Sequence, residues 1–197
     1  MEFIKKVGKE IESVFEDLAQ LRIEVFHDYP YLYEGTLEYE LEYLKTYANS
    51  EKGFLFAVYD QGQMVGATTA IPLKDETEEV QLPFIKEGFN LADIFYFGES
   101  ILLKSYRGIG LGHRFFDERE IYAKANGFKI TAFCSVDRGE NHPLKPSEYR
   151  PNDIFWSKRG YIPQPHLVCE MSWLDIGEIY STPKPLRFWI KHQDVIS

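Results

Sequence analysis

A glycine-rich turn between a predicted strand and a predicted helix constrains the fold of this chain more than any other feature. Residues 94–103 form a run of apolar and aromatic side chains typical of a strand, and residues 110–126 have a helical pattern that Gly127 would end. Arg107-Gly108-Ile109-Gly110-Leu111-Gly112 joins the two directly. A further strand at 129–136 completes a strand–helix–strand unit, so we expect a parallel strand pair within a mixed sheet.

The same turn predicts an anion site. Glycines at 108, 110 and 112 let the backbone approach a ligand and leave amide N–H groups pointing outward. The first amides of a helix have no partner within it, and the helix dipole adds partial positive charge there. Such a turn is a natural seat for a pyrophosphate, and Arg107 adds a permanent cation. A tight turn that binds nothing is the alternative.

Other phosphate-binding motifs fit this segment less well. A P-loop requires a Gly-Lys pair after the turn, and none is present. A dinucleotide fingerprint starting at Gly108 requires glycine at position 113, which is His113.

The rest of the pattern predicts hairpin-paired strands at one end of the sheet. Ser13-Val14-Phe15-Glu16 resembles a capping box at the start of a helix over 13–27. Tyr39, Tyr43 and Tyr47 are four residues apart and would share one face of a further helix. The remaining expected elements are strands at 3–7, 54–59, 64–73, 167–173 and 186–191, exposed loops at 74–79 and 139–151, and a short helix at 152–159.

Composition limits the class of protein. A chain of 197 residues without repeats fits a single domain over 1–197, and its net charge of −9 argues against a general nucleic-acid binder. Cys134 and Cys169 have no zinc-type spacing, so no metal site is expected. No stretch approaches the roughly 18 apolar residues of a membrane span, and the N-terminus does not resemble a signal peptide. We therefore expect a cytoplasmic protein without membrane or nucleic-acid partners.

The turn carries a family resemblance. Arg107–Gly112 matches in full the Arg/Gln-x-x-Gly-x-Gly/Ala signature at the strand–helix junction of GNAT superfamily acyl-CoA N-acyltransferases, and the chain resembles that family over most of its length. The helix containing Leu21–Phe26, the hairpin at 54–73 and Lys158-Arg159-Gly160-Tyr161 also match in position. The resemblance implies an α/β (α+β) fold: a mixed, mostly antiparallel central sheet with one parallel, splayed strand pair, flanked by helices. Gly98 would mark a bulge beside the splayed gap.

The resemblance also implies how acetyl-CoA binds as a co-substrate. The amides of the turn would hold the pyrophosphate, with His113 as a neighbour, and main-chain groups of one strand would hold the pantetheine arm like an added strand. The expected coenzyme-binding residues are Ile101, Leu102, Arg107, Gly108, Ile109, Gly110, Leu111, Gly112 and His113.

Three side chains are candidate catalytic residues. Glu99 lies eight residues before Arg107, where many GNAT members carry an acid, and its aromatic neighbours suit a general base working near neutral pH. The alternative is a solvent-facing or salt-bridged carboxylate. Many family members have a Tyr as general acid at the position of Trp156, and indole cannot serve as that acid. Tyr149, Tyr161 or water would then protonate the leaving thiolate.

These features predict an acetyl-CoA-dependent N-acetyltransferase that moves the acetyl group to a primary amine by direct attack, with help from a general base. The acceptor would be a small-molecule or peptide amine, and carboxylates within residues 28–42 favour a cationic one. Two alternatives remain open: a non-catalytic acyl-CoA-binding or sensing module on the same fold, and an interaction protein with an aromatic-rich surface. Exposed aromatic residues are also compatible with a homodimer.

Overall fold

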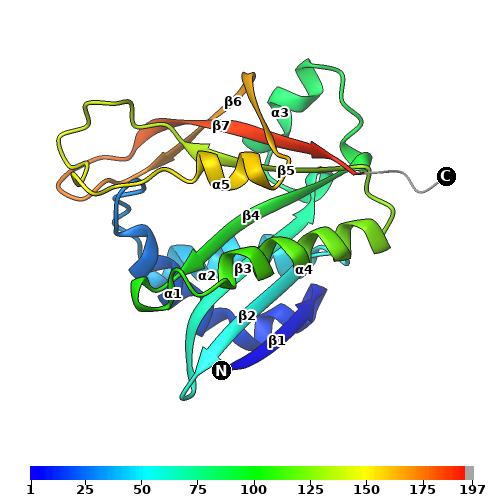
Figure 1. Ribbon diagram of the computed structural model, residues 1–197, viewed down its shortest axis with the longest axis horizontal. Helices are drawn as coiled ribbons and strands as arrows, with labels where there is room; N and C mark the ends of the chain where they lie inside the picture. The colour runs from blue at the N-terminus through cyan, green and yellow to red at the C-terminus, as the bar shows by residue number, and fades with distance from the viewer. Residues whose placement is uncertain (194–197) are drawn as a thin grey trace.

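One seven-stranded sheet organises the chain, with strand order β1-β2-β3-β4-β5-β7-β6. The computed structural model describes residues 1–193, and Figure 1 shows the sheet edge to edge. All neighbouring strands pair antiparallel except β4 and β5, which are parallel, so the predicted fold class is confirmed. The strands are β1 (Glu2–Val7), β2 (Phe54–Asp60), β3 (Gln63–Pro72), β4 (Ile94–Leu102), β5 (Ile130–Val136), β6 (Ile162–Trp173) and β7 (Thr182–His192).

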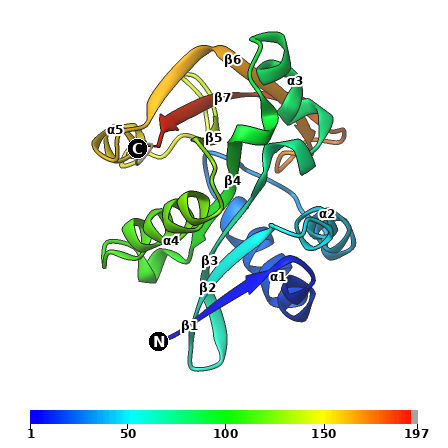
Figure 2. The same cartoon turned by 90° about the vertical axis from the view of Figure 1, so that its right-hand side faces the viewer.

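Helices cover both faces of the sheet, as the turned view in Figure 2 shows. One face carries α1 (Phe15–Phe26), α2 (Leu37–Asn49) and α3 (Glu78–Lys86), and the other carries α4 (Leu111–Ala125) and α5 (Asp153–Lys158). Each face has its own hydrophobic core. The α4 face is rich in aromatic rings, which accounts for many of the Phe residues. The short 3-10 turns are η1 (Gly8–Val14), η2 (Leu73–Asp75), η3 (Leu91–Asp93) and η4 (Lys104–Tyr106).

The sheet opens between its two parallel strands. β4 and β5 pair only over Ile94–Tyr96 and Ile130–Ala132, and beyond these residues the strands diverge (Figure 1). The opposite edge of β4 stays paired with β3 as far as Leu102. The edge of β4 from Phe97 onward therefore faces a gap, as the splayed pair predicts.

A β-bulge lies beside this gap. Thr68 pairs with Ser100 and Ala70 with Phe97, so two residues of β4, Gly98 and Glu99, lie opposite one residue of β3. A Cβ atom at Gly98 would lie 2.0 Å from the Tyr47 hydroxyl oxygen. Only glycine fits there, and the predicted bulge is confirmed.

Two local predictions were wrong, and one helix was not predicted. Ser13 Oγ donates to the Glu10 carbonyl within η1, and α1 starts at Phe15 without a side-chain cap, so no capping box forms there. The segment 74–79 is not simply an exposed charged loop, because Glu76 is buried. Helix α3 begins within this segment, at Glu78, and was not predicted, since Pro83 and the adjacent charges obscured its apolar face.

Candidate functional site

The glycine turn presents a row of free amides. Within residues 1–193, the backbone N–H groups of six consecutive residues, Gly108 to His113, have no hydrogen-bond partner. The first intrahelical bond of α4 runs from Arg114 N to the Gly110 carbonyl at 3.2 Å. The last three of the six amides are therefore the open first turn of a fifteen-residue helix, where the dipole favours an anion.

The conformation of the turn depends on two glycines. Gly108 and Gly110 have φ values of 81° and 91°, which side-chain-bearing residues rarely adopt. A Cβ at either position would meet nothing within 4 Å, so the space beside the backbone is open. The turn is therefore both shaped for close approach and unobstructed by the chain.

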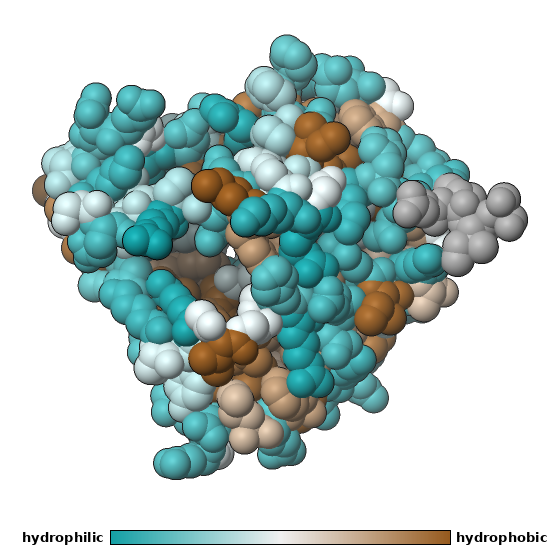
Figure 3. Space-filling view, in the orientation of Figure 1, coloured by the Kyte–Doolittle hydropathy of each residue, from teal (hydrophilic) through white to brown (hydrophobic). Residues whose placement is uncertain are grey.

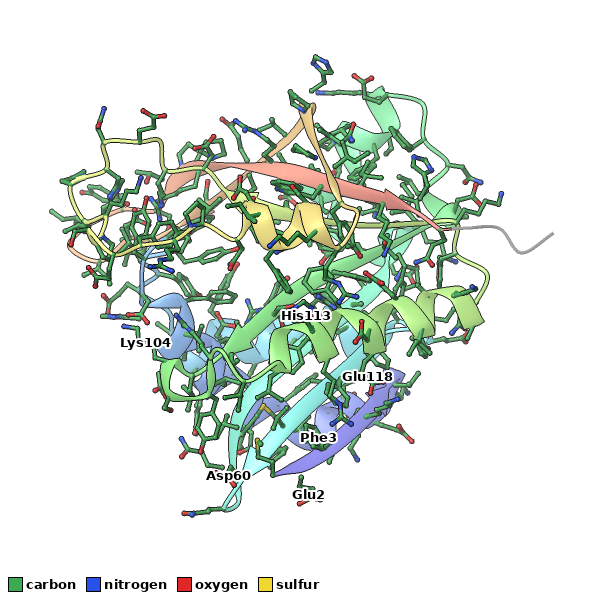
Figure 4. All side chains as sticks on the ribbon, viewed as in Figure 1. Glu2, Phe3, Asp60, Lys104, His113 and Glu118 are labelled. Atoms are coloured by element: carbon green, nitrogen blue, oxygen red, sulfur yellow. The ribbon has the colours of Figure 1, made fainter. Side chains whose placement is uncertain are left out.

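Arg107 and His113 flank the turn and are engaged with their neighbours. Arg107 Nε donates to the Leu102 carbonyl at 3.1 Å, which leaves its Nη atoms exposed beside the turn. His113 stacks edge-on against Phe155 of α5, with ring centroids 4.8 Å apart. In Figure 4, Lys104 lies just before the glycine turn, and His113 lies just after it, at the start of α4.

The gap between β4 and β5 leads away from this turn. Ile101 and Leu102 pair with Ala67 and Gly66 on one edge only, so their other main-chain edge faces the gap. Figure 3 shows the surface hollowed left of centre, between the part of the molecule that carries α4 and the part that carries α5. The predicted coenzyme-binding residues therefore lie together along one end of the open sheet.

Glu99 lies in the bulge on the α1 and α2 face, and its carboxylate is buried in an ion pair. Arg22 Nη1 of α1 donates to Glu99 Oε2 at 2.5 Å, and Arg22 Nε donates to Glu40 of α2. The salt-bridged alternative thus describes the contacts of Glu99. Burial alone would lower the pKa of Arg22, but the charges of Glu99 and Glu40 raise it well above its usual value.

The other carboxylate oxygens of this cluster have unusual surroundings. Glu99 Oε1 and Glu40 Oε1 are buried and have no hydrogen-bond partner within residues 1–193. Tyr43 of α2 lies under the Arg22 guanidinium, 4.6 Å from its ring centroid. Buried polar atoms without partners are few in folded proteins and often mark functional positions.

A third buried carboxylate continues the network. Tyr43 and Tyr47 share a hydroxyl contact of 3.2 Å, and the Tyr47 hydroxyl donates to Glu76 Oε1 at 3.2 Å. Burial raises the pKa of Glu76 above its ordinary value, and it does the same for Tyr43 and Tyr47. Arg22 pairs with Glu40 and Glu99, and Glu76 joins this acidic cluster through the hydroxyls of Tyr47 and Tyr43.

The two candidate acid tyrosines occupy different environments. The Tyr161 hydroxyl contacts Thr131 Oγ1 at 3.0 Å and donates to Glu120 Oε1 at 3.1 Å, and burial with the charge of Glu120 raises its pKa. Tyr149 is half-buried, with its ring edge-on against Tyr29 at 4.7 Å, and burial raises its pKa also. Of these two tyrosines, only Tyr149 has a hydroxyl without a hydrogen-bond partner among residues 1–193.

Trp156 is a packing residue in this structure. Its ring lies edge-on against Phe133 at 5.0 Å and against Trp189 at 5.2 Å. It anchors α5 to β5 and β7, and has no polar partner among residues 1–193.

The segment between α1 and α2 contacts residues at the ends of β5 and β6. Tyr33 forms a bridge with Asp175, and Trp173 Nε1 donates to the Tyr31 carbonyl at 3.0 Å. Arg138, which follows β5, pairs with Asp175 at 2.6 Å and also donates to the Tyr31 carbonyl. This segment therefore joins the β1–β4 half of the molecule to the β5–β7 half.

Sequence reasoning missed the cluster formed by Arg22, Glu40 and Glu76, and counted Glu40 only among the carboxylates within residues 28–42 that favour a cationic acceptor. Arg22 lies beside Leu18 and Leu21, and Glu40 shares a helix face with Leu44. For Arg22 and Glu40, a charged residue on an otherwise apolar helix face was the signal that could have indicated a buried, paired charge. The charge run at 74–79 concealed Glu76.

Comparison with solved structures shows a known architecture. An acetyltransferase of the GNAT family from Streptococcus pneumoniae matches with a TM-score of 0.59 at 14% identity, over 98% of this chain and 100% of that chain. The chain has the GNAT fold.

Two further structures share this fold. The ribosomal-protein-alanine N-acetyltransferase from Brucella melitensis matches with a TM-score of 0.62 at 11% identity, over 96% of this chain and 99% of that chain. An acetyltransferase from Salmonella typhimurium, solved with its cofactor acetyl-CoA, matches with a TM-score of 0.59 at 9% identity, over 100% and 97% of the two chains. Neither a protein-family model nor a curated protein matches the sequence. Among residues 1–193, no helix is both long and apolar enough to span a bilayer.

Proposed function

We propose that this protein is an acetyl-CoA-dependent N-acetyltransferase with one catalytic domain spanning the chain. The observation that carries the proposal is the row of six unpartnered amides at the open end of the splayed strand pair. These amides fit a pyrophosphate, and the open space beside Gly108 and Gly110 allows it to approach. The GNAT fold of acetyl-CoA-dependent enzymes supports the same assignment.

The chain's own residues divide the binding task. The amides of Gly108 to His113 would hold the diphosphate, with Arg107 beside them, and the free edge of Ile101 and Leu102 would hold the pantetheine arm. Bound acetyl-CoA would supply an acetyl group activated as a thioester. Main-chain hydrogen bonds along a strand edge orient an extended ligand without requiring side chains.

Glu99 is the proposed general base. Most biological amines carry a proton at pH 7 and must lose it before they attack a carbonyl carbon. Glu99 lies in the bulge at the gap, and its Oε1 has no hydrogen-bond partner among residues 1–193. The amine nitrogen would attack the acetyl carbon as Glu99 takes its proton, directly or through water. Tyr149, whose hydroxyl is free, is the proposed donor to the departing thiolate, with Tyr161 as the alternative.

The buried carboxylates support a cationic acceptor. Among residues 28–42, Glu40 lies in the cluster, whereas Asp28 pairs with Lys104 and Glu42 with Lys45 on the surface. Glu40, Glu76 and Glu99 are three buried carboxylates, and among residues 1–193 only Arg22 forms an ion pair with any of them. A primary ammonium group, on a small molecule or a peptide, would reduce this imbalance.

Coenzyme binding and turnover are tested separately. Acetyl-CoA at 100 times its Kd should stabilise the protein by about 2.7 kcal/mol, measured as a rise in Tm. Release of free thiol is then measured over a panel of primary amines. An unchanged Tm at millimolar acetyl-CoA would reject the proposed function.

A non-catalytic acyl-CoA-binding module is the second candidate. Trp156 favours it, because a packed indole stands where family members with a known acid have tyrosine. A raised Tm with acetyl-CoA but no thiol release with any amine would favour this module over the enzyme.

A further inference from the structure

Arg22 connects two carboxylates that come from different elements. Its Nε contacts Glu40 in α2 and its Nη1 contacts Glu99 in β4. The rings of Phe26 and Tyr43 lie 5.0 Å and 4.6 Å from its guanidinium carbon, and the side chain is 9% exposed. The aromatic contacts and the two ion pairs fix the guanidinium, so Arg22 fixes the orientation of the Glu99 carboxylate.

Arg22 and Glu40 have opposing effects on the proton affinity of the Glu99 carboxylate. A guanidinium beside Glu99 favours the ionised carboxylate and would by itself make a weak base. Glu40 shares the same guanidinium and places a second negative charge near Glu99, which offsets part of that effect. The planar guanidinium of an arginine can donate to both carboxylates at once, which a lysine ammonium does less well.

Other groups around Glu99 are neutral or farther from the carboxylate. Arg119 of α4 donates to the Glu99 main-chain carbonyl at 3.3 Å rather than to its side chain. The titratable and charged groups that act on Glu99 from the elements packed against it are Arg22 of α1, Tyr31 of the following segment, Glu40, Tyr43 and Tyr47 of α2, Glu76 and Arg119. Of these, Arg22 is the one that contacts the carboxylate.

We propose that Arg22 is a positioning residue for Glu99 and that Glu40 adjusts, through the shared guanidinium, how strongly Glu99 holds a proton. This inference rests on the proposed function. One oxygen of Glu99 is held by Arg22, and the other is left as the proton acceptor. Glu40 then acts on catalysis without touching either substrate.

The first test measures the proton affinity of Glu99 without any acceptor. Protein labelled with ¹³C at the glutamate carboxyl carbon is titrated by NMR, and the Glu99 signal is assigned by its loss in Glu99→Gln. Glu40→Gln should lower the midpoint of that signal by about one pH unit, because Arg22 then neutralises Glu99 alone. Glu42→Gln, on the exposed face of the same helix, should leave it unchanged.

A double variant tests the role of Arg22. Arg22→Met alone would leave two buried carboxylates unpaired and endanger folding. Arg22→Met combined with Glu40→Gln removes one charge of each sign, and the Glu99 midpoint should rise above that of wild type. An unchanged midpoint in either variant overturns the inference.

The second test connects proton affinity to catalysis. With the amine that turns over fastest, the acid limb of the kcat profile should move to lower pH in Glu40→Gln, in parallel with the NMR midpoint. Arg22→Lys should lower kcat at least tenfold while the KM for acetyl-CoA stays unchanged. A shifted midpoint with an unmoved acid limb would overturn the role of Glu40, whereas an absence of thiol release by wild type with every amine overturns the proposed function itself.

Discussion

The two sides of the open sheet are built in different ways. On the side that leads into α4, the proposed anion site consists of backbone amides from six consecutive residues. On the α1 and α2 side, the acidic cluster consists of side chains from Arg22, Glu40, Glu76 and Glu99, which are far apart in the sequence. The first site requires only a local conformation, whereas the second requires the whole fold. The proposed anion site and the acidic cluster thus differ in both charge and construction, which suits the proposed anionic coenzyme and the proposed cationic acceptor.

Removing the proposed base should have the largest effect. Glu99→Gln leaves Arg22 paired with Glu40, so the protein should fold, while kcat should fall by roughly 10²–10⁴-fold because general-base help is lost. Thiol release with the best amine measures this, and the Tm rise with acetyl-CoA should persist. Glu118→Gln is the control: its partly buried carboxylate on α4 pairs with Lys5 and Arg114, and the variant should retain activity. If Glu99→Gln turned over at the wild-type rate, the acidic cluster would have no part in the mechanism.

Altering the backbone site should have the next largest effect. Gly110→Ala places a methyl group in the open space beside the amides, and acetyl-CoA affinity should fall about tenfold or more, the equivalent of losing roughly 1.4 kcal/mol of binding. Gly127→Ala is matched for strain, because Gly127 also has a positive φ of 79° and open space, but it lies at the other end of α4. Isothermal titration calorimetry compares the two. Equal losses of affinity would mean that strain, and not the anion site, is responsible.

The two tyrosines should differ by a smaller amount. Tyr149→Phe should lower kcat several-fold by removing the proposed proton donor. Tyr161→Phe should retain most activity and lose about 1 kcal/mol of stability, since it breaks hydrogen bonds to Thr131 and Glu120. Steady-state kinetics and chemical denaturation of both variants separate these effects. The reverse pattern would assign the role to Tyr161.

The smallest effect concerns Glu76 and its pH dependence. Burial raises the pKa of Glu76, so its contribution to stability is fully present below about pH 4.3, the usual value for an unfolded chain, and is lost as the pH rises through the folded-state value. The Tm of wild type relative to Glu76→Gln should therefore fall between pH 4 and pH 8, by roughly 3–5 °C for each unit of pKa shift. Exposed Glu79, changed to Gln, should show no such trend. A constant difference across this range would contradict a strained acidic cluster.

The anion site at the glycine turn could be predicted from the sequence far better than the acidic cluster could. Gly108, Gly110 and the start of α4 are contiguous, so pattern and backbone chemistry together suffice to predict their arrangement. Glu99 was predicted from its distance to Arg107, but its ion pair depends on Arg22, 77 residues earlier in the chain. No local pattern reveals that pairing. Helix α3 and buried Glu76 were missed because a run of charges is read as solvent-exposed unless tertiary contacts are known.

The three residue pairs that join β4 to β5 have a consequence for solubility. Once the strands part, each has main-chain donors and acceptors in the middle of the molecule that the neighbouring strand does not satisfy. An extended ligand with amide groups would occupy those positions, and so would a strand from another protein molecule. Bound coenzyme should therefore compete with such a strand for the same main-chain groups. Concentrated protein stored without coenzyme should self-associate sooner than protein stored with it.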